Sequence, residues 1–394
     1  MGSMGVSAER KYGLPRFVRL QAPSSVTFSY ILARVNCALS GQGYAFGAIA
    51  IIVAIRMFAV EKGNLEYDRE SLDPLFWYAI ALWLTGFCLR IGKPHLAILY
   101  MLEGTALMLL AGGQTTIATS AVASMGAHYA DTWLVTMDSM IAPWFDWPAM
   151  VRTVAANSEL YAILNFAYIS AGWQPLLLMF IVLMCGRTAQ MLTFVTAGAL
   201  SLAVCLAVFA WMPAQGAFAQ YGITFSDVSE IQVSLGFDFL PILEGLRNGE
   251  ISRITKDNLS GLVSFPSMHA SVAATLALAW ARLGRWSAPM VALNALMAFS
   301  AMPVGNHYLV DIIAGVVLGA ASFWMAGRLV EHSRDDRLGY TDSAIGPQSR
   351  ADAGAIREQN PTAETAAFSG RSRRLVYEAG ERPAARNQSS LANR

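Results

Sequence analysis

The fold of this chain is decided by two short stretches, FPSMH at residues 265–269 and NHYLVD at residues 306–311, each of which stands where an apolar run meets a loop. Pro266 and Ser267 predict a helix start, because a proline disfavours helix in the residue before it and serine is a good N-cap. His269 then falls in the first turn of that helix, at the end where backbone N–H groups are unpaired.

The composition places the chain in a membrane. Hydrophobic residues make up 55% of the sequence and charged residues only 14%, whereas about a quarter of the residues in soluble domains are charged. The net charge of +1 argues against nucleic acid as a partner, since nucleic-acid binding requires a basic surface. We therefore expect an integral membrane protein whose partners are membrane lipids, and the sequence identifies no protein partner.

Eight segments are long and apolar enough to predict membrane spans, for which about 20 helical residues are needed. The fourth of them contains Gly172 and Pro175, which can break it into an interfacial piece and a span. The sequence thus predicts an all-α fold, a polytopic integral membrane helix bundle of about eight transmembrane helices. The predicted spans are residues 41–60, 72–91, 95–117, 161–185, 189–211, 267–283, 287–302 and 308–327.

Basic residues predict the orientation, because cytoplasmic loops of membrane proteins are enriched in Lys and Arg. They precede the first span and then recur at every second turn, while the loops between are acidic or mixed. Both termini are therefore expected in the cytoplasm, and His269 and His307 at the extracytoplasmic side of a bacterial inner or plasma membrane. The basic residues are Arg10, Lys11, Arg16, Arg19, Arg90, Lys93, Arg187, Arg282, Arg285 and Arg328.

Two predicted outer segments are too long to be simple connectors. Residues 127–157 hold bulky aromatic residues beside acids, which is typical of a helix at the level of the lipid headgroups; they are Trp133, Trp144, Phe145 and Trp147 with Asp131, Asp138 and Asp146. Residues 212–265 contain Arg247, Arg253 and Lys256. These three cations are either solvated surface charges or partners of an anionic headgroup, since Arg and Lys are the usual phosphate ligands.

The candidate catalytic residues are His269, His307 and Asp311. His307 and Asp311 are four residues apart, so on a helix they share one face and the carboxylate can hold the imidazole. A His/Asp pair at this spacing often arises by chance, but here a second histidine follows Pro266 and Ser267 about forty residues earlier. Two histidines with an orienting acid suffice for covalent phosphoryl transfer: one attacks phosphorus and the other protonates the departing alkoxide.

At these residues the chain resembles the PAP2 (type 2 phosphatidic acid phosphatase) superfamily of integral membrane phosphoesterases and lipid phosphotransferases. Its Pro-Ser-x-His element is matched by residues 266–269, and its nucleophilic His with an Asp four residues later by His307 and Asp311. The resemblance covers roughly residues 130–330. It implies that His307 forms a phosphohistidine, that Asp311 orients it, and that His269 acts as general acid and then base, with no metal or other cofactor.

The sequence departs from the common pattern of this superfamily in two places. The Ser-Arg that usually precedes the nucleophilic histidine reads Ser300-Ala301, and no Lys-x6-Arg-Pro element is present. Both features resemble the inositolphosphotransferase branch, which includes inositol phosphorylceramide synthase-like proteins and has a His-Tyr-x-x-Asp signature. Substrate binding is therefore expected from Ser267 and from the outer-segment cations Arg247, Arg253 and Lys256.

The expected organisation has four parts: a cytoplasmic N-terminal segment at residues 1–24, transmembrane helices at 25–125, a PAP2-like catalytic transmembrane domain at 126–330 and a disordered cytoplasmic tail at 331–394. The expected function is transfer or hydrolysis of a lipid-linked phosphate, with headgroup transfer slightly favoured. A simple phosphatidic acid or polyprenyl diphosphate phosphatase is the alternative. A transporter that uses the His/Asp pair as a proton relay is an alternative from another class.

Overall fold

The computed structural model describes residues 41–92, 96–224 and 234–344, together with Val35, Leu39 and Val228. The predicted N-terminal segment 1–24 and the part of the predicted tail beyond residue 344 lie outside the described residues. The chain divides into two units at Arg334, and the packing described below lies within the first, Met1–Arg334.

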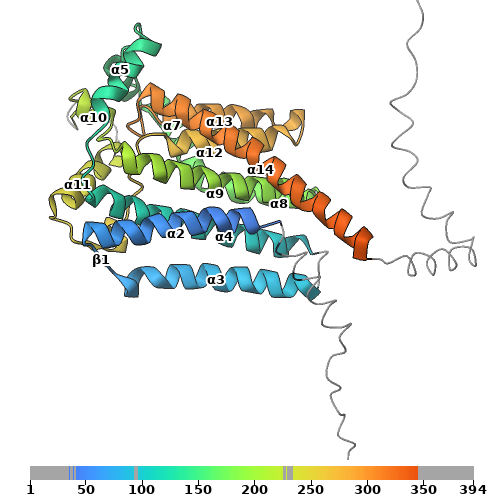
Figure 1. The fold of residues 1–394 in the computed structure, drawn as a ribbon. Coiled ribbons are helices and arrows are strands. Elements are labelled where there is room, and N and C mark those ends of the chain that lie inside the picture. Colours follow the sequence, from blue (N-terminus) through green and yellow to red (C-terminus); the bar gives the residue numbers. More distant parts are fainter. Residues whose placement is uncertain are drawn as a thin grey trace, which may run out of the picture. The chain divides into compact units, whose positions relative to one another are not determined.

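The described residues confirm the all-α prediction, since helices account for nearly all regular structure (Figure 1). Two two-residue strands, β1 (Glu66–Tyr67) and β2 (Arg253–Ile254), pair in parallel. The α-helices are α2 (Gly43–Gly63), α3 (Arg69–Gly92), α4 (Ala97–Ser124), α5 (Asp131–Ile141), α6 (Trp147–Ala155), α7 (Ser158–Ile169), α8 (Gln174–Met184), α9 (Thr188–Trp211), α10 (Ala217–Gln220), α11 (Ser234–Asn248), α12 (Met268–Ala281), α13 (Ala288–Ser300) and α14 (Leu309–Ala344). Short 3-10 turns are η1 (Ser170–Gly172), η3 (Lys256–Asn258) and η4 (Arg285–Ser287).

Each of the eight predicted spans coincides with helix, but not all are full-length crossings. Within the residues that the structure describes, five helices are long and apolar enough to cross a membrane: α2, α3, α4, α9 and α14. The fourth predicted span is broken as Gly172 and Pro175 suggested: α7 with η1 meets α8 at an angle of 58°. Helices α12 and α13 have 14 and 13 residues, so at 1.5 Å per residue they extend about 20 Å, less than the ~30 Å hydrocarbon layer.

The N-terminal helices pack around α4. Helices α2 and α3 both contact α4, and α4 in turn contacts α9 (Figure 1). A buried ion pair links α3 to α4: the Nε of Arg90 lies 2.5 Å from Glu103 Oε1, and the Gln42 amide also donates to Glu103. Arg90, which the charge pattern assigned to a cytoplasmic loop, is thus buried with a partner, as a charge within a membrane protein must be.

Helices α12 and α14 approach closely through two glycines. A Cβ atom at Gly315 would lie 2.4 Å from the Ser267 carbonyl oxygen, and one at Gly319 only 2.2 Å from that of Ser271. Glycines four residues apart on a helix permit this backbone contact between membrane helices. The contact brings the start of α12, with His269, beside the start of α14, just after His307.

The loops group by their predicted side. On the predicted outer side, β1 from the α2–α3 loop pairs with β2, and Asp68 lies 2.9 Å from Arg253. On the predicted inner side, Arg187 donates to the Arg282 carbonyl at 2.6 Å, which joins the α8–α9 loop to the α12–α13 loop. These contacts agree with the alternation of basic and acidic loops along the chain.

Candidate functional site

The two sequence motifs meet through their backbones. The Ser267 N–H donates to the Asp311 carbonyl at 3.1 Å, and the Ser267 hydroxyl accepts from the Ala270 N–H at 3.3 Å. Ser267 is therefore the N-cap of α12, as the sequence predicted, and it is completely buried. Its hydroxyl oxygen is engaged in capping, and its expected role in substrate binding stays a prediction.

His307 and Asp311 are paired, but not as one helical face. The distance from His307 Nδ1 to Asp311 Oδ2 is 3.2 Å, and the same carboxylate oxygen accepts from the Tyr308 N–H at 3.0 Å. Because α14 begins only at Leu309, His307 lies in the preceding loop and Asp311 reaches back to it across the helix start. Burial lowers the pKa of His307 to about 4, so the ring is neutral near neutral pH. With Nδ1 beside the carboxylate, Nε2 is the nitrogen that points away from Asp311, and the Ser264 backbone also hydrogen-bonds to the ring.

Both histidines line one pocket of about 380 Å³. Its walls come from the end of α7 with η1, from α11, from the loop that leads into α12, from the start of α12, and from the loop before α14. The lining residues are Tyr168, Ile169, Ala171, Gly172, Phe239, residues 260–264, Met268, His269, Gly305, Asn306 and His307. The structure therefore brings His269 together with His307 and its partner Asp311, as the sequence predicted.

Tyr168 is a pocket residue that the sequence did not single out. Its ring stacks on the His269 ring with centroids 3.9 Å apart and an angle of 16° between the planes. A Cβ at Gly305 would lie 2.7 Å from Tyr168 Cε2, so the tyrosine fits against His269 and against the loop that carries His307. The only sequence signal was a polar aromatic residue at the end of an apolar run.

The three predicted phosphate-binding cations do not line this pocket. Arg253 pairs with Asp68 and Lys256 is exposed in η3. The Arg247 guanidinium lies 4.0 Å above the centre of the Tyr129 ring. The lining residues of the pocket in the described part of the chain include no Lys or Arg.

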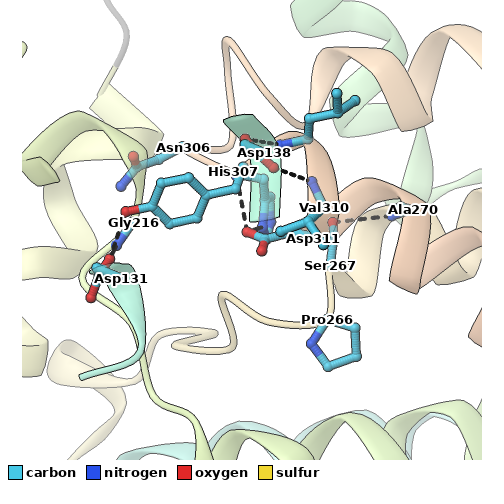
Figure 2. A network of polar contacts seen from close by, with 12 residues as sticks. Asp131, Asp138, Gly216, Pro266, Ser267, Ala270, Asn306, His307, Val310 and Asp311 are labelled. Atoms are coloured by element: carbon cyan, nitrogen blue, oxygen red, sulfur yellow. Dashed lines mark hydrogen bonds and ion pairs between the residues drawn. The ribbon is translucent and has the colours of Figure 1, made fainter. Parts of the chain in front are cut away.

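The outer segment 127–157 is more deeply involved than its composition suggested. Trp144 is 82% exposed, as expected of a headgroup-level residue, but Trp147 is only 1% exposed and its indole donates to the His307 carbonyl at 3.1 Å. Asp131 and Asp138 are buried as well: Asp131 contacts Tyr308 in the loop before α14, and Asp138 contacts Val310 in the first turn of α14 (Figure 2). The composition of this segment suggested a helix at the headgroup level, but it did not show that Trp147, Asp131 and Asp138 are buried by contacts with α14 and the loop before it.

Comparison with known protein families gave a match that includes this site. Among the described residues, no cluster of three or more His, Cys, Asp or Glu side chains could hold a metal ion. Neither the curated proteins nor the solved structures gave a match to the chain. Residues 132–325, which hold both motifs and every residue lining the pocket, match the family model described as the PAP2 superfamily, as the sequence resemblance predicted.

Proposed function

We propose that the chain is a membrane-embedded PAP2-type phosphatase or phosphotransferase that acts on a lipid-linked phosphate through a phosphohistidine on His307. The observation that carries this proposal is that His269 and His307 line one pocket, with Asp311 on the Nδ1 side of His307. The family match over residues 132–325 supports the reaction class.

The proposed reaction has two steps. In the first, the lone pair of His307 Nε2 attacks phosphorus, the bond from phosphorus to the lipid oxygen breaks, and His269 gives its proton to the departing alkoxide. In the second, neutral His269 takes a proton from water or an alcohol, whose oxygen attacks the phosphohistidine and releases His307. The Asp311 carboxylate stabilises the positive charge that develops on the His307 ring during attack.

The environment of His307 suits a nucleophile. A neutral imidazole has a free lone pair, and the lowered pKa keeps His307 neutral at physiological pH. A buried ring also loses little hydration on meeting phosphorus, because it is already shielded from water. The carboxylate is held in place by the Tyr308 N–H, so it does not have to reorganise as charge develops.

Phosphate binding in this pocket has to differ from the common pattern of the PAP2 superfamily, in which an arginine precedes the nucleophilic histidine. Ala301 stands where the common pattern has arginine; it is completely buried, and its carbonyl accepts from the His307 N–H at 3.3 Å. We infer that the N-terminal turn of α12 meets the phosphate charge, and that the bound phosphate anion in turn favours the protonated form of His269. Arg247, Arg253 and Lys256 stay proposed partners for the rest of an anionic headgroup.

The missing arginine and the His-Tyr-x-x-Asp motif favour headgroup transfer of the inositolphosphotransferase type over simple hydrolysis of phosphatidic acid or a polyprenyl diphosphate. The alternation of basic loops favours a pocket on the extracytoplasmic side of a bacterial inner or plasma membrane, with residues 1–24 and 331–394 in the cytoplasm. The same two steps operate with water or with an alcohol as the acceptor, so only the products distinguish hydrolysis from headgroup transfer.

The test is to incubate purified protein with phosphate-labelled phosphatidic acid in mixed micelles, with and without a second lipid alcohol. Free labelled phosphate identifies a phosphatase, and label on a second lipid identifies a transferase. His307→Ala is expected to lower turnover by at least about a thousandfold, because the covalent route is lost. His128→Ala is the matched control, since His128 is exposed and outside the pocket.

The transporter alternative is tested in parallel. Proton flux across sealed proteoliposomes that depends on His307, without turnover of any lipid phosphate, would replace the proposed enzyme by a proton-coupled carrier.

A further inference from the structure

Helix α5 carries two carboxylates on the face that meets the His307 loop. Asp131 and Asp138 are seven residues apart, two helical turns, so they project from the same side of α5. Both are almost completely buried, whereas Trp133, Met140 and Ile141 on the remainder of the helix are exposed. A helix with buried acids and exposed apolar residues reverses the usual pattern of a soluble surface helix, so the acids require a specific explanation.

Asp138 holds the first turn of α14. Its Oδ2 accepts from the Leu309 N–H at 2.9 Å and its Oδ1 accepts from the Val310 N–H at 2.7 Å (Figure 2). These are N–H groups that a helix start cannot satisfy internally. The preceding N–H, that of Tyr308, goes to Asp311. Asp138 therefore supplies from another helix the cap that fixes where α14 begins, two residues after His307.

Asp131 holds the same loop from its other side. Its Oδ1 accepts from the Tyr308 hydroxyl at 2.8 Å and from the Gly216 N–H at 2.9 Å. The segment after Gly216 also forms a hydrogen bond with Asn306: the Ala217 N–H donates to the Asn306 carbonyl at 3.2 Å. Asn306 has a φ of 63°, a left-handed conformation that asparagine tolerates better than most residues. The chain on both sides of His307 is thereby held by contacts with other segments of the protein.

We propose that Asp131 and Asp138 are positioning residues, which hold the loop that bears His307 and so set the direction in which its Nε2 points into the pocket. This inference rests on the proposed function, because the benefit of a fixed direction is in-line attack on phosphorus. Neither carboxylate touches the pocket, so both act through His307. A displacement of about 1 Å in a reacting group can lower a rate about a hundredfold.

The test compares Asp138→Asn with Asp146→Asn. Asp146 lies in the same outer segment and caps α6 through the Ala149 N–H at 2.9 Å, but it is exposed and does not contact the His307 loop. An asparagine at position 138 offers one acceptor oxygen for two donors. With labelled phosphatidic acid as the probe, Asp138→Asn is expected to lower kcat about a hundredfold at an unchanged KM, and Asp146→Asn to retain wild-type kcat.

A second readout does not depend on turnover. Diethyl pyrocarbonate modifies accessible neutral imidazoles, and peptide mapping reports each histidine separately. In Asp138→Asn, His307 is expected to react faster while His269 stays protected, with exposed His128 as the reference for reagent access. Wild-type kcat with unchanged protection of His307 would overturn the proposal. A parallel rise in the reactivity of His269 and His307 together with a lower Tm would also overturn it, because that result indicates general unfolding.

If Asp138→Asn does not fold, Tyr308→Phe is tested in its place. That variant removes only the Tyr308 hydroxyl, which donates a hydrogen bond to Asp131. An unchanged kcat and unchanged His307 protection in Tyr308→Phe would then contradict the proposal. If wild-type protein turns over no lipid phosphate, the proposed function fails by itself, and the reactivity of His307 still decides whether α5 holds the loop.

Discussion

His307 combines a buried neutral ring with a carboxylate on one of its nitrogens, and this combination defines what the residue can do. The ring is 5% exposed and its partner Asp311 is completely buried. The environment therefore keeps the ring of His307 neutral, and it places a carboxyl group beside Nδ1, where the proposed phosphohistidine would carry positive charge. The sequence predicted both residues and their pairing, but not the geometry, because a spacing of four suggests a helical face and not a loop residue beside a helix start.

Burial of His307 predicts a loss of stability in mild acid. Its pKa is about 4 in the folded protein, against about 6.5 in an unfolded chain. Between these values the unfolded state binds a proton that the folded state does not, so the free energy of unfolding falls as the pH drops through this window, by at most about 3 kcal/mol in total. Denaturant unfolding in detergent at several pH values should therefore show a steeper pH dependence for wild type than for His307→Gln. An equal pH dependence of stability in the two proteins would contradict the lowered pKa of His307.

Tyr168 is expected to hold the ring of His269. Tyr168→Ala removes the stacked face, which is worth about 1 kcal/mol, so kcat should fall about fivefold. Tyr168→Phe keeps the ring and is the matched control, expected within about threefold of wild type. Steady-state assays with labelled phosphatidic acid make the comparison. An equal loss in both variants would show that the hydroxyl, not the stacking, is what matters.

At the scale of elements, the sequence predicted well what depends on neighbouring residues. The Ser267 N-cap fixes the start of α12, and Gly172 with Pro175 marks the break between α7 and α8. It did not predict what α5 does, because Asp138 meets its partner Val310 across 172 positions of sequence. Asp131, Asp138 and Trp147 have the composition of an interfacial helix, and only the folded chain shows that they face inward.

The close contact between α12 and α14 predicts that one added methyl group at Gly319 lowers the stability of the protein. In Gly319→Ala the new Cβ would meet the Ser271 carbonyl oxygen, a backbone atom that cannot move aside without shifting α12. Overpacking of this kind costs about 1–3 kcal/mol. Thermal unfolding in detergent should show a lower Tm than for Gly198→Ala on α9, where a Cβ has open space. A Gly319→Ala variant as stable as Gly198→Ala would mean that the helices are farther apart.

At the scale of the whole molecule, the charge pattern predicted which loops lie together. The β1–β2 pairing and the contact of Arg187 with Arg282 agree with it. In the described part of the chain, fewer helices are long enough to cross a membrane than the eight predicted segments, because apolar content does not show where a helix ends: α12 and α13 are shorter than the apolar runs that contain them. The start of α12 is set by its Ser267 cap, whereas α13 starts without a side-chain cap.

Orientation gives a prediction at this scale. Trp144 and Trp286 are 82% and 84% exposed and lie in loops assigned to opposite sides. In a background with the four native cysteines replaced by serine, Trp144→Cys should react with an impermeant maleimide added to intact cells. Trp286→Cys should react only after the membrane is opened. Labelling of both variants in intact cells, or a reversed pattern, would refute the assigned topology.

The central claim is that His307 takes the phosphoryl group from a lipid. The most direct measurement is to quench wild-type protein during turnover of phosphate-labelled phosphatidic acid under alkaline conditions, which preserve phosphohistidine, and to map the label by mass spectrometry. The account predicts label on His307, no label in His307→Ala, and unchanged labelling in the exposed His128→Ala. Label on His269, or turnover without any labelled histidine, would contradict it.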